Sequence, residues 1–286
     1  MPNIGLRALV PNVPGEALPH GLLGGCVPVV NADDAHHFNG TELVPAGCNQ
    51  ANAWVDCPDP STGWVNPDQK VFDRPVSCAF DPVTIYAGYE CSAIGSSFEE
   101  AQQNALDQLA RGEQRALELH FMQTWLTNAD NTADLTPFAG AVHIASGIGL
   151  LETWLADNYG GAGVLHMPVG VGALAARFGV VNFPREDECI RTLVGNSVVL
   201  GAGYSANLGP AEPPNVPEPA LAGEAWLYIT PPMRIRRDNR VLAQSTMRQA
   251  VDTRVNDIRV LAETTFVPEM ACCIAAAVRI DLSPCC

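Results

Sequence analysis

The sequence contains no recognisable set of catalytic residues. A serine hydrolase commonly carries its nucleophile in Gly-x-Ser-x-Gly, but Gly203-Tyr204-Ser205 lacks the following glycine. His143 and His166 each stand among apolar residues, which is more typical of core histidines than of general bases. His36-His37 lies near Asp33-Asp34 and could bind a metal weakly, although a solvated polar loop is the favoured interpretation. We therefore predict no catalytic residue, with a cysteine or histidine enzyme as the less favoured alternative.

Metal and cofactor sites are not indicated either. The cysteines form no Cys-x-x-Cys pair, and the adjacent thiolates of Cys272-Cys273 and Cys285-Cys286 cannot easily bind one tetrahedral ion. Gly147-Ile148-Gly149 and Gly160 to Gly163 lack the strand-before, helix-after context of a phosphate-binding loop. We expect no metal and no cofactor.

The redox state of the cysteines is left open by the sequence. Their even number would suggest disulfides in a secreted protein, but without an export signal we expect them to begin reduced, many as small buried apolar groups. They could still oxidise in a particle that later leaves the cell. The ten positions are Cys26, Cys48, Cys57, Cys78, Cys91, Cys189, Cys272, Cys273, Cys285 and Cys286.

Charged residues are distributed unevenly along the chain. Seven arginines gather between positions 234 and 259, whereas the region around Lys70, which is the only lysine, is acidic. We expect the arginines to contact the acidic segment of a neighbouring copy. A solvated face, with ion pairs contributing about 0 to 1 kcal/mol each, and a local contact with packaged nucleic acid are the alternatives. The candidate intersubunit contacts are Lys70, Asp68, Asp73, Asp81, Arg234, Arg236, Arg237 and Arg240.

Composition excludes several classes of protein. With 286 residues, of which 47% are hydrophobic, the chain can bury a sizeable core and is not globally disordered. No run approaches 18 uninterrupted apolar residues, so we expect no membrane span. The formal charge of −15 disfavours wrapping of nucleic acid by the whole surface.

The first ninety residues are rich in proline and are expected to be extended. Prolines and turn signals interrupt any helix in residues 1–53, which we interpret as an irregular arm that gains order by lying on something else. Residues 54–94 carry short β-type pieces between further prolines, which is typical of an edge ribbon.

Helix signals follow the ribbon. Ser96-x-x-Glu99 and Ser97-x-x-Glu100 both match the capping box, and apolar residues at helical spacing predict about thirty residues of helix. Thr136-Pro137 suggests the start of a second helix, which ends at Gly160-Gly161.

The rest of the chain reads as a mixed α/β lobe with a C-terminal hairpin. We expect strands at 163–167, 197–200 and 224–230, a short helix at 169–178 and another pair within 233–243. Five prolines mark 207–223 as an excursion outside the core. Two apolar runs, 256–267 and 269–282, are expected to form an antiparallel hairpin hinged at Pro268.

This order of parts resembles the HK97-type capsid fold of tailed-phage major capsid proteins and encapsulin shells. The resemblance covers roughly residues 54 to 282 and rests on element order and short phrases. The phrases are Phe80-Asp81-Pro82-Val83-Thr84-Ile85-Tyr86 before Ser97-Phe98-Glu99-Glu100, Gly163-Val164-Leu165-His166-Met167-Pro168, Gly195-Asn196-Ser197-Val198-Val199 and Leu261-Ala262-Glu263-Thr264-Thr265-Phe266-Val267.

The resemblance implies an α+β fold divided in the manner of such capsid proteins. It comprises an N-terminal arm at 1–53, an E-loop ribbon at 54–94, a P-domain with a spine helix at 95–135 and 252–286, and an A-domain at 136–251. Some family members crosslink an E-loop lysine to an asparagine of a neighbour. No acceptor matches by motif here, and we expect Lys70 to form no such crosslink.

The implied function is a major capsid protein that self-assembles through hexamers and pentamers into the icosahedral head of a phage. Its partners would be copies of itself, with scaffold, portal or decoration proteins as possible additions and packaged DNA contacted only non-specifically. Its place would be the virion, assembled in the host cytoplasm. An encapsulin-type compartment and another virion part, such as a tail or decoration protein, are the alternatives.

Overall fold

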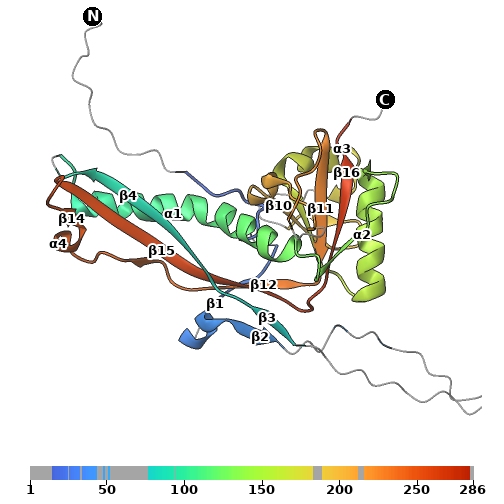
Figure 1. The fold of residues 1–286 in the computed structure, drawn as a ribbon, viewed down its shortest axis with the longest axis horizontal. Helices are drawn as coiled ribbons and strands as arrows, with labels where there is room; N and C mark the ends of the chain where they lie inside the picture. Colours follow the sequence, from blue (N-terminus) through green and yellow to red (C-terminus); the bar gives the residue numbers. More distant parts are fainter. Residues whose placement is uncertain are drawn as a thin grey trace, which may run out of the picture.

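The computed structural model of the protein describes residues 15–24, 26–32, 34–43, 48, 51, 77–93, 95–182, 189–211 and 216–283. These residues form a long, narrow part and a broader lobe at one end of it (Figure 1). The narrow part consists of helix α1 (Phe98–Phe121) lying along strands β4 (Val83–Ser92) and β15 (Asp257–Met270). Its arrangement is fixed by the apolar face that each of these elements must bury.

The long sheet is organised around β15. Every second residue from Ile258 to Phe266 is buried, and this period-two pattern turns one face of the strand toward α1. In the described part of the chain, β15 pairs antiparallel with four strands, and β1 pairs parallel with one of these, β12. The sheet therefore contains β4, β15, β1 (Val29–Asn31), β12 (Met233–Arg237), β13 (Val241–Leu242) and β14 (Val251–Asp252), beside the short helix α4 (Met247–Ala250).

Helix α1 begins where the sequence predicts. The Ser97 hydroxyl accepts from the Glu100 N–H at 3.1 Å, and the Glu100 carboxylate accepts from the Ser97 N–H at 3.0 Å, which completes the capping box. After 24 residues the helix passes into a π-helix, Met122–Leu126, so the prediction of about thirty helical residues is confirmed. Its fully buried apolar residues include Ala101, Ala105, Leu109, Leu117 and Phe121.

The lobe is built on a second, mixed sheet. Its central order is β16-β11-β7-β10, and helix α2 (Ile144–Asn158) packs on β16 and β11. The strands predicted at 163–167, 197–200 and 224–230 are confirmed as β7 (Val164–Pro168), β10 (Ser197–Gly201) and β11 (Glu224–Thr230). The remaining elements are β5 (Thr132–Asp134), β6 (Val142–His143), β8 (Val181–Asn182), β9 (Arg191–Thr192), β16 (Ala275–Asp281), α3 (Gly172–Arg177), and the 3-10 turns η3 (Val169–Val171) and η4 (Gly203–Ala206).

The predicted start of the second helix at Thr136-Pro137 is wrong. Helix α2 begins at Ile144, where the His143 imidazole accepts from the Ala145 N–H at 3.2 Å and caps it. The Thr136 hydroxyl instead accepts from the N–H of Arg279, which ties this residue to β16. The residues that follow enter strand β6 instead of a helix, so the tertiary contact overrides the local signal.

The predicted C-terminal hairpin is also wrong. Strand β15 continues through Pro268 to Met270, and β16 joins the other sheet, so the two strands do not pair with each other. Ile235 lies opposite Pro268, but it donates its N–H to the Pro28 carbonyl on the far side of β12. Ile235 and Pro268 are therefore a non-hydrogen-bonded pair of the antiparallel ladder, in which Pro268 is not required to donate an N–H to β12. On the other edge of β15, the pairing with β4 ends at Phe266. Pro268 therefore has no β4 residue opposite it, and this edge tolerates a proline.

The N-terminal segment was predicted to be irregular, and its described residues contain regular structure. Strand β1 extends the long sheet, a 3-10 helix follows at Ala35–Asn39, and β2 (Thr41–Leu43) pairs with β3 (Cys78–Phe80). Leu22 and Val27 are buried in the core. The arm was expected to gain order by lying on something else. Its described residues between 15 and 43 lie on the body of their own chain.

The proline-rich excursion at 207–223 closes against β11 in its described residues. Asn207 adopts a left-handed conformation, with φ of 52°, and its side chain accepts from Trp226 N–H at 2.8 Å and donates to Glu224 C=O at 3.0 Å. Leu208 and Pro219 form an isolated bridge. Proline has no backbone N–H to donate, but this loop tolerates it because few backbone N–H groups are needed for strand pairing here.

No helix within the described ranges combines the length and apolar character needed to cross a bilayer.

The two parts meet where η4 approaches α1. A Cβ on Gly203 would lie 2.5 Å from the Arg115 carbonyl oxygen and equally close to Glu118 Cβ, so only glycine allows this contact. We expect Gly203→Ala to lower the free energy of unfolding by about 1–3 kcal/mol, measured by urea denaturation. The control is Gly112→Ala in exposed helix, where a Cβ meets nothing within 4 Å and about 0.5–1 kcal/mol of stabilisation is expected. Equal effects of the two substitutions would contradict the contact.

Candidate assembly interface

The predicted contact residues are distributed over several parts of the chain. Lys70, Asp68 and Asp73 lie outside the described residues. Asp81 is exposed in the turn between β3 and β4. The four arginines lie together, on β12 for Arg234, Arg236 and Arg237 and in the turn before β13 for Arg240.

Arg234 and Arg236 share one carboxylate on the neighbouring strand. Glu269 of β15 is paired with Arg234 opposite it, and Arg236 Nε donates to Glu269 Oε1 at 2.7 Å. Burial opposes ionisation of this side chain, which is 1% exposed, but the hydrogen bonds from the two arginines prevail and its pKa lies below the ordinary value. The carboxylate is therefore held in its charged form.

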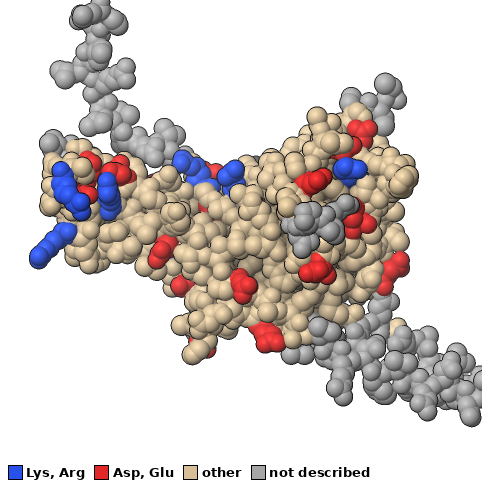
Figure 2. Space-filling view, viewed as in Figure 1, with Lys and Arg blue, Asp and Glu red and all other residues tan. Residues whose placement is uncertain are grey.

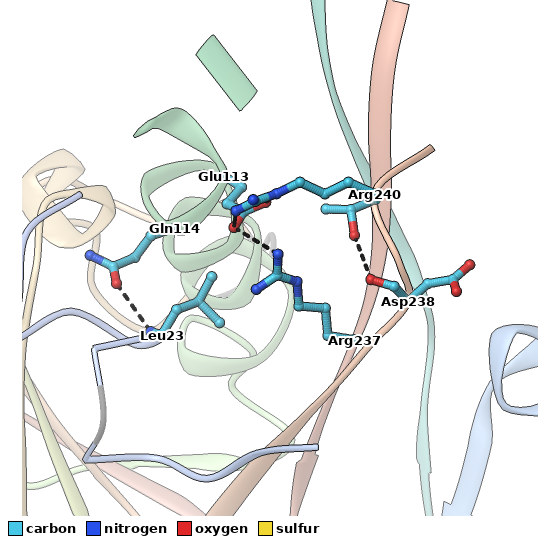
Figure 3. Close-up of polar contacts among 7 residues, drawn as sticks. Leu23, Glu113, Gln114, Arg237, Asp238 and Arg240 are labelled. Atoms are coloured by element: carbon cyan, nitrogen blue, oxygen red, sulfur yellow. Dashed lines mark hydrogen bonds and ion pairs between the residues drawn. The ribbon is translucent and has the colours of Figure 1, made fainter. Parts of the chain in front are cut away.

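Arg237 and Arg240 share a second buried carboxylate, Glu113 of α1 (Figure 3). Arg240 binds it in a bidentate manner, with contacts of 2.6 and 3.1 Å, and Arg237 lies 3.6 Å away. The Glu113 side chain is 4% exposed. Such forked pairing fixes orientation as well as charge, so it holds the turn after β12 to the middle of α1.

The four arginines therefore already have intramolecular partners, and their contact with a neighbouring copy stays a prediction. Sequence reasoning missed Glu113 and Glu269 because each is far along the chain from its arginines. A signal was available: Glu113 stands four residues from both Leu109 and Leu117, on the apolar face of the predicted helix. A charge on such a face requires a buried partner.

Glu118, one turn further along α1, joins three parts of the molecule. Its carboxylate accepts from the N–H of Leu22 at 2.9 Å and from the N–H of Gly203 at 2.8 Å. Nearby, Gln114 accepts from the N–H of Leu23 (Figure 3) and also donates to the carbonyl of Leu18. The buried polar face of α1 thereby holds both the N-terminal segment and the lobe.

The environment of Glu118 shifts its ionisation. Burial raises its pKa above the ordinary value, and hydrogen bonds from the backbone N–H groups of Gly203, Leu22 and Ala202 offset part of this effect. The direction of the shift identifies desolvation as the dominant cause.

Asp81 borders a surface hollow of about 370 Å³ at the end of α1. Trp125 of the π-helix lines it and stacks on Phe80, with ring centroids 4.8 Å apart. His120 and Pro268 also contribute to its wall. The hollow lies where β3, the π-helix and the end of β15 converge.

Several large apolar side chains stand exposed on the lobe and on the long sheet. Phe138 is fully exposed, and Leu193 and Val194 are exposed by 79% and 67%. Tyr86 projects from β4 with 70% exposure. A single exposed apolar residue is ordinary, but a phenylalanine as fully exposed as Phe138 offers apolar area to a contact surface.

Positive charge gathers at the far end of the long sheet. Figure 2 shows blue side chains around α4 and β14, with red ones among them, and both colours elsewhere on this face. Arg248, Arg254 and Arg259 are exposed there, and Arg259 lies 3.1 Å from Glu90 and 3.3 Å from Asp252. This end and the exposed apolar residues of the lobe are the surfaces best suited to contact neighbours.

His166 is a core histidine, as interpreted from its sequence context. It is fully buried, its Nδ1 lies 2.9 Å from the Tyr204 hydroxyl and its Nε2 lies 3.0 Å from the Thr230 hydroxyl. Burial lowers its pKa to about 3, so it stays neutral at physiological pH. With both nitrogens bonded inside the core, it is not placed to act on a substrate.

Comparison with solved structures identifies the fold. The chain is similar to a structure from Mycobacterium phage Ogopogo, with a TM-score of 0.53 and 13% identity, covering 96% of this chain and 96% of that one. It is also similar to the capsid of a native GTA particle, with a TM-score of 0.50 and 12% identity, covering 94% of this chain and 100% of that one. No protein-family profile and no curated protein matches the sequence.

At these identities the likeness establishes the fold. The chain shares its fold with these two structures, one of which is a capsid, and the likeness spans almost all of it. This agrees with the capsid fold that the sequence resemblance predicted. Its mixed α and β composition agrees with the predicted class.

The raised pKa of Glu118 makes a pH-dependent prediction. Because the folded chain binds this proton more tightly than the unfolded chain, its contribution to stability is full below the ordinary pKa of 4.5 and declines as pH rises through the raised value. We therefore expect wild type to gain stability relative to Glu118→Gln when pH is lowered from about 7 to about 4.5, measured by urea denaturation. The exposed Glu16→Gln variant is the control. A constant difference between wild type and Glu118→Gln at both values would contradict the prediction.

Proposed function

We propose that this protein is the major subunit of an icosahedral shell that encloses a phage genome. The observation that carries the proposal is the capsid fold, which extends over nearly the whole chain. A fold does not by itself define a function, but shell assembly uses the whole subunit surface and not a local site. A structural role also agrees with the arrangement of His166, whose nitrogens are occupied inside the core.

The shape and surface of the subunit support self-association. The narrow part consists of a long sheet covered by the single helix α1, so it exposes a large area relative to its volume. Contact with other molecules would stabilise such a part further. The exposed apolar residues of the lobe, led by Phe138, supply area that water would otherwise cover. Many modest contacts of this kind add up through multivalency.

We further assign the parts of the subunit by the resemblance. In this proposal α1 is the spine helix of the P-domain and residues 54–94 form the E-loop. The A-domain, expected at 136–251, corresponds to the lobe, although β12, β13 and β14 of that range lie in the long sheet and the lobe takes in β16. Strand β4 would be the return strand of the E-loop, and its antiparallel pairing with β15 would anchor that loop to the P-domain. The partners are further copies of the chain, arranged as hexamers and pentamers, and the location is the virion.

Electron microscopy and sedimentation of the purified protein test this proposal. We expect closed shells, and particles from the native source should contain DNA. Rings, tubes or a stable monomer would contradict it, and shells that hold an enzyme instead of DNA would assign a compartment function. Particles boiled in SDS should run as single chains, and a ladder abolished by Lys70→Arg would overturn the expectation that Lys70 forms no crosslink.

The exposed phenylalanine provides a sharper test. We expect Phe138→Asp to lower the yield of sedimentable shells by about tenfold or more, since a buried contact at one interface is repeated in every subunit. Phe138→Leu keeps an apolar side chain at the same position and should assemble nearly as well as wild type. Circular dichroism of both variants checks that the subunit itself is folded. Equal yields from both variants would exclude Phe138 from the interface.

A further inference from the structure

Three pairs of cysteines lie within bonding reach of each other in the folded chain. The pairs are Cys26 with Cys189, Cys48 with Cys272, and Cys78 with Cys273, with Cα separations of 4.9, 5.5 and 5.8 Å. These separations fall in the range that a disulfide spans without backbone movement. Cys91, on β4, is the free cysteine among those described.

Two of these pairs converge on one short turn. Cys272 and Cys273 are adjacent in the link between β15 and β16, which connects the long sheet to the lobe. Their partners, Cys48 and Cys78, stand at the two ends of the segment that spans residues 49–77, and Cys78 opens β3. The two bonds would close a covalent ring through residues 48–78 and 272–273.

Each of these two pairs combines one buried and one half-buried cysteine. Cys272 and Cys78 are 1% and 2% exposed, whereas Cys48 and Cys273 are half-buried. A small oxidant can therefore reach one thiol of each pair first, and the buried thiol lies beside it to complete the reaction. Thiol–disulfide exchange begins at an accessible thiolate, and in each pair the half-buried cysteine can supply it.

We propose that these four cysteines form an oxidative clasp, closed by a low-molecular-weight disulfide such as glutathione disulfide. The thiolate of Cys48 or Cys273 attacks a sulfur of that disulfide, which releases one glutathione and leaves a mixed disulfide. The thiolate of the buried partner then attacks the cysteine sulfur and releases the second glutathione. Two cysteine thiols lose two electrons and two protons, and one glutathione disulfide becomes two glutathiones.

The clasp fixes both ends of residues 49–77 to the turn between the two sheets. It is a property of the folded subunit and does not depend on the proposed shell. A clasp within one chain also differs from a bond between copies, because denatured, oxidised protein would still migrate as a single chain.

The single lysine allows a decisive test. After free thiols are blocked with iodoacetamide and the protein is denatured, endoproteinase Lys-C cuts only after Lys70 and yields fragments 1–70 and 71–286. Cys26→Ser removes the Cys26–Cys189 bond, which would also link the two fragments. In this variant we expect the fragments to remain joined without reductant and to separate with it. In Cys26→Ser/Cys48→Ser we expect them to separate without reductant.

Cys91→Ser is the matched control, and its fragments should stay joined without reductant as in wild type. Separation of the fragments in Cys26→Ser alone, or their persistence together in Cys26→Ser/Cys48→Ser, would overturn the Cys48–Cys272 bond. A ladder of multimers on a non-reducing gel would show bonds between copies instead of a clasp.

Tryptic mapping tests the second bond. Without reduction, peptide 260–279, which carries Cys272 and Cys273, should be joined to both 8–70 and 71–111. In the matched double variant Cys48→Ser/Cys272→Ser, the same peptide should remain joined to 71–111 alone. In the mismatched variant Cys48→Ser/Cys273→Ser it should be alkylated and unattached. Attachment in the mismatched variant would overturn the specific pairing.

Melting temperature reports whether the clasp stabilises the subunit. After equilibration with glutathione disulfide, Cys48→Ser/Cys78→Ser should melt about 5 to 15 °C below Cys91→Ser. Equal melting temperatures would contradict a stabilising clasp. All these measurements use the purified chain whether or not it assembles, so failure of the clasp and failure of the shell proposal are distinguishable.

Discussion

The pairing of β15 is the constraint on which the rest of the fold depends. This strand pairs with β4 along ten register pairs and also pairs with β12, β13 and β14. Without β15, only β1 and β12 of the long sheet would pair with each other. Its buried face, from Ile258 to Phe266, covers α1. Because its longest pairings, with β4 and β12, join residues far apart in sequence, the long sheet forms only when the chain closes large loops, and it gains stability cooperatively when it does.

Buried carboxylates on α1 and β15 determine how the other parts attach to this framework. Glu113 and Glu269 each hold two arginines from β12 and the turn that follows, and Glu118 holds backbone groups of the N-terminal segment and of η4. Removing an ionised group from water is unfavourable unless partners are placed around it. These interactions therefore favour one arrangement of the parts more strongly than they add net stability.

The sequence predicted local features well and long-range ones less well. The capping box at Ser97 and the apolar spacing after it located α1, and the apolar runs located β7, β10 and β11, because each of these signals depends only on nearby residues. The start of α2 was misplaced because the Thr136 hydroxyl accepts from Arg279 of β16. The hairpin at Pro268 was wrong because β15 continues through this proline, at a position where strand pairing requires no backbone N–H. The arginine cluster was identified, but its partners Glu113 and Glu269 lie far away in sequence, and spacing alone could not connect them.

If the subunit forms a closed shell, the angle between the long sheet and the lobe must be the same in every copy, since an error there is repeated at each contact and leads to open assemblies. The connection at residues 271–274 is short, but a short link alone does not prevent rotation. The approach of Gly203 to α1 and the hydrogen bonds of Glu118 restrict that rotation on one side. The clasp at Cys272-Cys273 would restrict it at the link itself, where the bonds of Cys48 and Cys78 hold two further strands of chain against the turn. The features that fix this angle are thus concentrated at the junction of the two sheets.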